Sequence, residues 1–406
     1  MAFAQKTLRT GATPADDQIR VMVVDDAVVI RGLLSRWLDA DPGLAVVGSH
    51  RNGKRAVDDI EKSDPDVVVL DIEMPEMDGM TALPLMLAKK RDLIVIMAST
   101  LTRRNAEISL KALSLGAADY VPKPETTSEV TTSVDFRREL IDKVKALGQR
   151  ARRRRSAVSA RAMRAETAAG RTAAPARPVS NKVNTREAFK NGPASSPSAP
   201  RAQFKLRSYP SVRPRILAIG SSTGGPQALQ VVMRDLGTAI NDIPVVITQH
   251  MPPTFTSILA EHVGKAAMRP SKEGQDGEML KPGNIYVAPG GKHMLVEKSG
   301  AGMKIKLTDD APVNFCKPAV DPLFESIANA FGSAALGLIL TGMGHDGAEG
   351  VRHIASAGGA VITQDEASSV VWGMPGAAAQ TGMCSDVLPL REIGPKVARV
   401  IKGVTR

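Results

Sequence analysis

The sequence predicts two α/β domains, each built on a mainly parallel β-sheet, and two observations carry this prediction. Short apolar runs alternate with segments of helical length, first over residues 18–150 and again over 213–404, which is typical of parallel sheets. Between these regions, residues 151–212 are rich in Ala, Arg, Ser and Pro and have no hydrophobic periodicity. Such a segment buries no core, so we expect a disordered basic linker.

The length, the composition and the cysteine content limit which classes of protein the sequence can belong to. A chain of 406 residues with 43% hydrophobic residues is long enough for two or three domains with sizeable cores. Its two cysteines, Cys316 and Cys384, are far apart and form neither a disulfide framework nor a metal-binding spacing. The first residues lack the apolar core of a signal peptide, and no apolar run approaches the length of a membrane span. We therefore expect a cytoplasmic protein with reduced thiols.

The net charge of +11 comes mostly from the linker, which includes Arg152-Arg153-Arg154-Arg155. Such a run could bind nucleic acid or an acidic membrane surface, or it could keep a solvated linker extended. No aromatic residues for base stacking lie between the arginines, which argues against nucleic acid as a partner.

The first domain should form its sheet from four apolar runs, each followed by polar residues. A helix should follow the first run, at Val28–Ala40, and another should close the domain at Asp135–Gln149. The expected strands are Ile19–Val24, Asp66–Leu70, Leu93–Ala98 and Ala118–Val121.

The carboxyl ends of these strands carry three carboxylates, a hydroxyl and a lysine: Asp25, Asp26, Asp71, Ser99 and Lys123. Functional groups of parallel sheets gather at this edge. Crowded carboxylates repel one another unless a cation lies among them, and oxygen ligands suit Mg²⁺. A lysine and a hydroxyl nearby could then contact a phosphoryl group on Asp71. Taken singly, each aspartate is more readily explained as an ordinary solvent-facing residue at a strand end, but five such groups at four strand ends are hard to obtain by chance.

Four motifs in this region, V-V-D-D, L-D-I-E-M-P-E-M-D-G, M-A-S-T and Y-V-P-K-P, resemble a response-regulator receiver domain over residues 18–150. The resemblance implies a flavodoxin-like fold, a sensor histidine kinase as phosphodonor and a Mg²⁺ cofactor. Ala27 departs from it, since many receivers have serine there. It also assigns roles: Asp25, Asp26 and Asp71 as metal ligands, Asp71 as phosphoacceptor, Ser99 as switch hydroxyl, Tyr120 as switch aromatic and Lys123 as phosphate contact.

The second domain should be doubly wound, with a β-hairpin inserted in it. Asn284–Ala288 and His293–Glu297 are short apolar runs separated by Gly290-Gly291, which predicts that they pair as this hairpin. The expected sheet strands are Arg215–Ile219, Pro244–Thr248, Leu336–Leu340 and Ala360–Thr363. The expected helices are Gln227–Leu236, Thr254–Val263, Val320–Ala330, Gly347–Ala357 and Arg391–Lys402.

The turn after the first of these strands points to a serine nucleophile. Gly220-Ser221-Ser222-Thr223-Gly224 fits G-x-S-x-G, a strand–turn–helix that exposes the hydroxyl of Ser222 beside a helix N-terminus. By itself the pattern also fits an ordinary Gly/Ser-rich turn. The G-K-[ST] ending of a phosphate-binding loop is missing.

A base and a carboxylate follow at later strand ends. Of the six histidines, His250 comes two residues after the strand Pro244–Thr248, and Asp346 lies in the Gly-rich turn after Leu336–Leu340. We therefore expect Ser222, His250 and Asp346 to form a catalytic triad. The chain order Ser, His, Asp differs from that of α/β-hydrolases, so we do not expect that fold.

The same turn offers a competing interpretation, because Gly342-x-Gly344-x-x-Gly347 matches the dinucleotide-binding fingerprint. Asp365 and Glu366 lie at about the distance of the ribose-binding acid. Against a dehydrogenase, Asp346 would place a carboxylate where the pyrophosphate should bind.

Four motifs, A-I-G-S-S-T-G-G, I-T-Q-H-M-P-P, L-T-G-M-G-H-D-G-A and V-V-W-G-M-P, resemble the catalytic domain of chemotaxis protein-glutamate methylesterases over residues 213–404. The resemblance implies the triad Ser222, His250 and Asp346, an oxyanion contact from the Met343 N–H and a site lined by Thr223. It further implies a serine hydrolase without a cofactor, which demethylates glutamate methyl esters of methyl-accepting chemoreceptors and deamidates receptor glutamines. His345 departs from it, since the family more often has asparagine there.

Two rival functions stay open at this point. A DNA-binding response regulator would need a helix-turn-helix output module, whereas the second half of the chain is predicted to be an α/β domain. A serine esterase for small metabolites would have the same triad but a different substrate.

Overall fold

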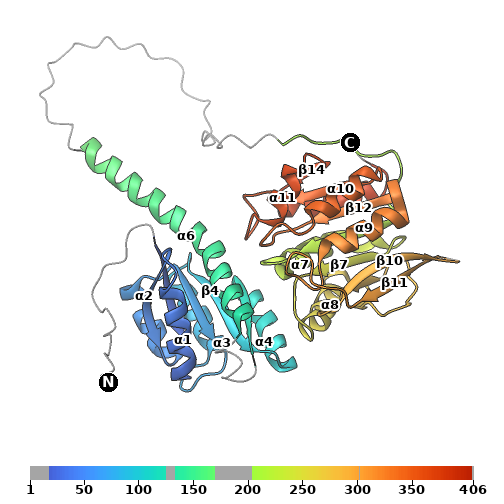
Figure 1. Cartoon of the computed structure of the whole chain (residues 1–406). Coiled ribbons are helices and arrows are strands. Elements are labelled where there is room, and N and C mark those ends of the chain that lie inside the picture. Colours follow the sequence, from blue (N-terminus) through green and yellow to red (C-terminus); the bar gives the residue numbers. More distant parts are fainter. Residues whose placement is uncertain (1–17, 125–132, 170–203, 301, 405–406) are drawn as a thin grey trace, which may run out of the picture. The chain divides into compact units, whose positions relative to one another are not determined.

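The computed structural model describes residues 18–124, 133–169, 204–300 and 302–404 (Figure 1). For residues 150 and 153–169 it describes the backbone alone. Both α/β domains belong to one compact unit, and a second unit comprises Arg153–Phe204. None of the helices in the described ranges combines the length and the apolar character that crossing a membrane requires.

The first domain is a flavodoxin-like parallel sheet, as predicted. Its strand order within the described residues is β2-β1-β3-β4-β5, with every neighbouring pair parallel. The strands are β1 (Ile19–Val24), β2 (Leu44–His50), β3 (Val67–Asp71), β4 (Ile94–Thr100) and β5 (Asp119–Lys123). The helices between them are α1 (Val28–Asp39), α2 (Gly53–Ser63), α3 (Gly79–Lys89) and α4 (Arg103–Ser114).

Strand β2 was missing from the sequence prediction. It is an edge strand that pairs with β1 alone, and most of its residues are only partly buried. Its apolar character ends early, because Gly48, Ser49 and His50 complete it. A strand with one neighbour and few buried side chains carries a weak hydrophobic pattern.

Helix α6 (Val134–Ala169) closes the first domain and is longer than predicted. We expected it to end at Gln149 and the linker to begin at 151. Residues 151–169 are dominated by Ala and Arg, which have high helix propensity, so the helix continues without an apolar stripe. The rest of the predicted linker includes 170–203, which lie outside the described residues.

The second domain is a doubly wound parallel sheet, as predicted. In the described residues its strand order is β14-β13-β12-β6-β7-β9-β8, and all pairs are parallel. The strands are β6 (Ile216–Ser221), β7 (Val245–Gln249), β8 (Ser271–Glu273), β9 (Ile285–Val287), β12 (Ala335–Ile339), β13 (Ala360–Gln364) and β14 (Asp386–Leu388). The chain leaves β6 toward β7 and later returns to its other side at β12, which makes the carboxyl end of β6 the topological switch point.

In the described ranges, six α-helices and two short 3₁₀ segments accompany these strands, and the last helix follows the last strand. The α-helices are α7 (Gly225–Leu236), α8 (Phe255–Ala267), α9 (Val320–Phe331), α10 (Ala348–Ser356), α11 (Met374–Gln380) and α12 (Leu390–Ile401). The 3₁₀ segments are η1 (Gly237–Ile240) and η2 (Gly332–Ala334).

The domain contains an inserted hairpin, but its predicted pairing was wrong. β9 joins the main sheet in parallel with β7 and β8. The hairpin consists of β10 (His293–Ser299) and β11 (Gly302–Thr308), which pair antiparallel as a separate sheet. All three residues of β9 are buried, as is typical of a strand inside a parallel sheet.

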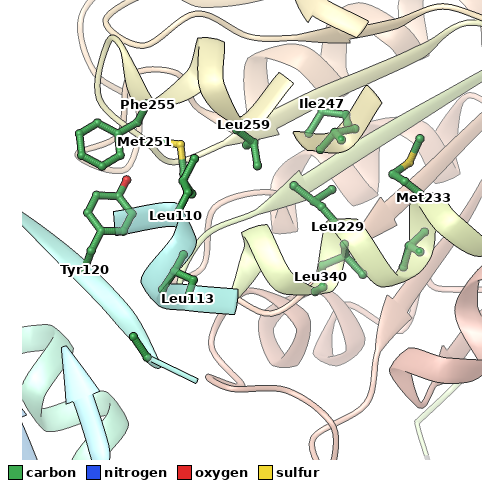
Figure 2. Close-up of a cluster of buried hydrophobic side chains, with 14 of the residues drawn as sticks. Leu110, Leu113, Tyr120, Leu229, Met233, Ile247, Met251, Phe255, Leu259 and Leu340 are labelled. Atoms are coloured by element: carbon green, nitrogen blue, oxygen red, sulfur yellow. The ribbon is translucent and has the colours of Figure 1, made fainter. Parts of the chain in front are cut away.

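A buried apolar cluster contains residues of both domains. Figure 2 shows Leu110, Leu113 and Tyr120 of the first domain with Phe255 and Leu229 of the second. The rings of Tyr120 and Phe255 are stacked, with centroids 4.6 Å apart and planes 7° from parallel. The Gln227 side chain donates to the Ala117 carbonyl at 3.2 Å. The aromatic residue predicted to be the receiver's switch therefore contacts the start of α8, which follows His250 in the chain.

Candidate functional site

Ser222 and His250 lie at one edge of the second sheet, each directly after its strand. Strands β6 and β7 pair with Ser221 opposite Gln249, and the His250 N–H donates to the Ser221 carbonyl at 3.0 Å. Gln249 adds a second link, because its side chain accepts from the Ser221 hydroxyl at 2.7 Å and donates to the Ser222 carbonyl at 2.8 Å. Neighbouring parallel strands thus bring the predicted nucleophile and base to the same edge.

The backbone at Ser222 is fixed by a close approach of the turn after β12. The Ser222 N–H donates to the Thr341 carbonyl at 3.0 Å. A Cβ atom on Gly342 would lie 2.9 Å from the Ser222 Cβ, so only glycine fits there. Gly224, with φ of 75°, caps helix α7. The strand–turn–helix expected from the G-x-S-x-G pattern is present.

His250 and Asp346 are hydrogen-bonded to each other. His250 Nε2 lies 2.7 Å from Asp346 Oδ2, and their side chains are 11% and 2% exposed. Asp346 lies in the turn between β12 and α10, on the side of β6 opposite β7. Three different strand ends therefore contribute Ser222, His250 and Asp346, and the structure joins the predicted base to the predicted carboxylate.

The Asp346 carboxylate is held by four donors. Its Oδ2 accepts from His250 Nε2 and from the Val320 N–H at 2.6 Å. Its Oδ1 accepts from the Asn314 side chain at 3.0 Å and from the Asp321 N–H at 3.2 Å. Sequence reasoning missed Asn314 and the start of helix α9 as parts of this site. Nothing in the local pattern indicated them, because Asn314 lies in irregular chain between β11 and α9.

The electrostatics favour an ion pair between His250 and Asp346. Burial by itself would lower the pKa of His250, but its hydrogen bonds to Asp346 and Cys316 raise it well above the ordinary value. Burial would raise the pKa of Asp346, but the hydrogen bond and positive charge of His250 hold it below the usual range. The neighbouring Asp321 shows the opposite behaviour, since burial and then the Asp346 charge raise its pKa to about 6.

The second ring nitrogen of His250 faces a thiol. His250 Nδ1 lies 3.3 Å from Cys316 Sγ. Within the described part of the chain, no hydrogen bond joins the Ser222 hydroxyl to His250. The structure thus brings Ser222 and His250 to the same edge and pairs His250 with Asp346, while Cys316 occupies the nitrogen that Ser222 would use.

Met343 and Thr223, the residues predicted to contact the oxyanion and line the site, lie on the two loops that meet at Ser222. Met343 directly follows Gly342, which packs against Ser222. The Thr341 hydroxyl donates to the Thr223 carbonyl at 2.9 Å and so joins the two loops. Among the described residues, neither the Met343 N–H nor the buried Thr223 Oγ1 has a hydrogen-bond partner. Both groups are therefore available to a ligand next to Ser222.

Two aspartates that bear on the dinucleotide interpretation have other partners, one inside the G-x-G-x-x-G pattern and one at the expected ribose-binding position. Asp346, inside the G-x-G-x-x-G pattern, is buried against His250. Asp365 Oδ1 accepts from the Ser368 N–H at 3.0 Å and from its hydroxyl at 2.6 Å, which closes a turn after β13. His345 is exposed, and among the described residues its side chain makes no hydrogen bond to Ser222, His250 or Asp346. These contacts favour the triad interpretation of the turn.

In the first domain, Asp25, Asp26 and Asp71 each offer a carboxylate oxygen, and these atoms lie within 4.8 Å of one another. Lys123 Nζ lies 3.1 Å from Asp25 Oδ2 and 2.7 Å from Asp71 Oδ1. Burial is the main cause that raises the pKa of Asp71 to about 6, with Lys123 opposing it and Asp25 adding to it. This oxygen-only, negatively charged set fits a hard divalent cation such as Mg²⁺.

The predicted switch residues lie on β4, which pairs with the strand of Asp71, and on β5, which lies beyond β4 in the sheet. Strand pairing sets Asp71 opposite Ala98 and Ser99 opposite Pro122, so the Ser99 position adjoins the acidic cluster. The Ser99 hydroxyl lies 2.9 Å from that of Ser109. On β5 the Tyr120 carbonyl accepts from Lys143 of α6 at 2.6 Å. The Ser99 position is thus connected to α4, and the Tyr120 position is connected to α6.

Comparison with known proteins adds to this geometry. The CheB methylesterase family matches residues 217–397, and the response regulator receiver domain matches 21–135. The protein-glutamate methylesterase/protein-glutamine glutaminase of group 2 operon from Rhodopseudomonas palustris strain CGA009 is 56% identical over 387 residues, 95% of each chain. Its counterpart from Bradyrhizobium diazoefficiens strain USDA 110 is 54% identical over 407 residues, 99% of each chain. The catalytic domain structure of Thermotoga maritima CheB is 36% identical, with TM-score 0.45, and covers 47% of this chain and 100% of its own.

The likeness to the two full-length relatives is not confined to one half of the chain. Each alignment extends over at least 95% of both sequences, so the relatives share the order of receiver and methylesterase domains. The residues found at the strand ends of both sheets lie inside the matched ranges. The chain therefore belongs to the CheB methylesterases that carry a response-regulator receiver domain.

Proposed function

We propose that this chain is a phosphorylation-regulated serine hydrolase that removes methyl groups from glutamate methyl esters on methyl-accepting chemoreceptors. The observation that supports it most is the gathering of Ser222, His250 and Asp346 at three strand ends, with His250 and Asp346 hydrogen-bonded at 2.7 Å. Relatives with more than half of their residues identical are named protein-glutamate methylesterase/protein-glutamine glutaminase. Deamidation of receptor glutamines is proposed for the same site.

The reaction follows from the roles of these side chains. The Ser222 hydroxyl attacks the ester carbonyl, and His250 Nδ1 accepts its proton. Asp346 holds His250 Nε2–H and stabilises the imidazolium that forms. The Met343 N–H donates to the oxyanion. Methanol leaves with the proton from His250, and water then hydrolyses the acyl-enzyme along the same path.

This path requires a change of partner at His250. Its Nδ1 contacts Cys316 Sγ in the structure, so the thiol must yield that nitrogen to Ser222 before the attack. Catalytic hydrogen bonds commonly form only when substrate is bound. A substrate carbonyl seated between Ser222 and the Met343 N–H would bring the hydroxyl toward the ring.

The receiver supplies the regulation in this proposal. Asp25, Asp26 and Asp71 would hold Mg²⁺, which supplies charge neutralisation for phosphoryl transfer from a sensor histidine kinase to Asp71. Ser99 and Lys123 would contact the phosphoryl group. Tyr120 is stacked on Phe255 at the start of α8. Through this contact, the structural change that follows phosphorylation of Asp71 would alter the catalytic domain.

The proposed function is tested by incubating the full chain with methylated chemoreceptor and measuring released methanol, with and without phosphodonor. Release that rises with phosphodonor supports the proposal. A small methyl ester serves as the control substrate, since equal turnover of both would favour the metabolite esterase. Specific, salt-dependent DNA binding would instead revive the DNA-binding regulator.

The raised pKa of His250 predicts an unusual pH dependence. The base acts only when its Nδ1 is deprotonated, so kcat/KM should rise with pH through a midpoint above 6.5, the ordinary value for histidine. The charged and titratable groups around it are Asp346 and Cys316, with Asp321 next to Asp346. Methanol release measured across pH gives the midpoint.

Asp346→Asn is the matched control for this midpoint. Removing the negative charge that stabilises the imidazolium should lower the pKa of His250. Because the variant should also lose most turnover, the titration is followed by NMR of the His250 ring protons, assigned by comparison with His250→Ala. A His250 pKa at or below 6.5 in the unaltered chain would contradict the prediction.

A further inference from the structure

The proposed activity makes no use of Cys316, although its thiol contacts the catalytic base. Cys316 Sγ lies 3.3 Å from His250 Nδ1, while His250 Nε2 lies 2.7 Å from Asp346 Oδ2. The imidazole therefore links a thiol on one side to a buried carboxylate on the other. A thiol next to a base that a third group orients is the arrangement that activates a cysteine nucleophile.

The backbone turn around Cys316 holds the thiol in this place. Val313 and Cys316 exchange both backbone hydrogen bonds, at 3.1 and 2.9 Å, and so close a two-residue turn. Its central residues, Asn314 and Phe315, have φ of 52° and 63°, values that non-glycine residues rarely adopt. The Asn314 side chain is anchored on Asp346 at 3.0 Å. The same carboxylate therefore fixes both the imidazole and the turn that carries the thiol.

The chain also contains an internal reference thiol. Cys316 is partly exposed, whereas Cys384 is fully buried and its thiol donates to the Ala378 carbonyl at 3.4 Å. Burial raises the pKa of Cys384 to about 12. A thiol reagent in solution should therefore react with Cys316, which is accessible and lies next to His250, and not with Cys384, which is buried and has no such neighbour.

We propose that Cys316 is a modification site for low-molecular-weight disulfides, and that its modification switches off the esterase. The second half of this statement rests on the function proposed above. The thiol proton leaves to water, the His250 imidazolium stabilises the Cys316 thiolate through its Nδ1–H, and the thiolate attacks one sulfur of the disulfide. The disulfide bond breaks, and its other half leaves as a thiolate that takes a proton from water. Cys316 is oxidised to a mixed disulfide, and the external disulfide is reduced by the same two electrons.

The mixed disulfide blocks the serine reaction through His250. Its new group is attached to an atom 3.3 Å from Nδ1, so it covers the nitrogen that must accept the Ser222 proton. A thiol reductant reverses the exchange and restores the base. Such a bond is transient in a reducing compartment, as redox-sensing disulfides are. Adaptation would then stop under oxidising conditions without any change in receiver phosphorylation.

The test treats the full chain with glutathione disulfide at neutral pH and follows both the adduct mass and methanol release. Peptide mapping should place one adduct on Cys316 and none on Cys384. Activity should fall in proportion to the adduct and return after dithiothreitol. Cys384→Ser should behave like the unaltered chain. Cys316→Ser should form no adduct, and its activity should match that of its own untreated sample.

Two further variants separate this inference from the proposed function. Ser222→Ala should still form the Cys316 adduct, because adduct mass requires no esterase activity. His250→Ala should form it on the order of ten-fold more slowly, since an isolated thiol at neutral pH is only a few per cent thiolate. Equal rates with and without His250, modification of Cys384 first, or full activity of the Cys316 adduct would each overturn the inference. Mapping on the unaltered chain decides the site even if Cys316→Ser fails to fold.

Discussion

Ser222→Ala is expected to lower kcat for release of methanol from methylated receptor by about 10⁴- to 10⁶-fold. The Ser222 oxygen forms the acyl bond in the proposed reaction. Without it, His250 has no hydroxyl to deprotonate, and no acyl-enzyme can form. The structural hydrogen bonds of Ser222 come from its backbone, to Thr341 and from Gln249. The variant should therefore fold normally and bind receptor, so that the loss is one of chemistry.

The neighbouring Ser221 is the matched control. Its buried hydroxyl donates to Gln249 Oε1 at 2.7 Å, so Ser221→Ala leaves that acceptor unpaired and should cost about 1–3 kcal/mol of stability. Its turnover should stay within about ten-fold of the unaltered chain, since it supplies no reacting atom. More than a few per cent of turnover in Ser222→Ala, or a dead Ser221→Ala, would place the nucleophile elsewhere.

The parts of the site that could be predicted are those at strand ends. Ser222, His250 and Asp71 each lie within three residues after a buried apolar run, and the edge of a parallel sheet then gathers the functional residues of each domain. Asp346 lies several residues beyond β12, but its Gly-rich turn ties it to the same edge. For these residues, the local sequence pattern and the topology of a parallel sheet are sufficient to predict their place in the site.

The parts that could not be predicted depend on segments outside helices and strands, or on which strand or side chain a group pairs with. Asn314 and Cys316 reach His250 and Asp346 through a tight turn of non-glycine residues with positive φ, which no residue pattern indicates. The choice of β11 rather than β9 as the hairpin partner of β10 is made by tertiary packing. Which nitrogen of His250 faces Asp346 is likewise visible only in three dimensions.

Asp71→Asn is expected to abolish stimulation of the esterase by phosphodonor and Mg²⁺ while basal hydrolysis continues. The asparagine side chain cannot form the acyl phosphate, and the ligand set of Asp25, Asp26 and Asp71 loses one negative charge. The signal should start at Lys123, which contacts Asp71 at 2.7 Å and ends the strand that contains Tyr120. None of these residues belongs to the Ser222 site, so the two activities should separate.

Acetyl phosphate with Mg²⁺ serves as phosphodonor, and methanol release and acid-labile phosphate on the protein are measured together. Asp92→Asn is the control, because Asp92 is an exposed aspartate of the same domain. It should keep both phosphorylation and stimulation. Phosphate that still forms on Asp71→Asn would rule out Asp71 as the acceptor. Stimulation that persists without phosphate would show that acetyl phosphate or Mg²⁺ stimulates the esterase by a route other than phosphorylation of Asp71.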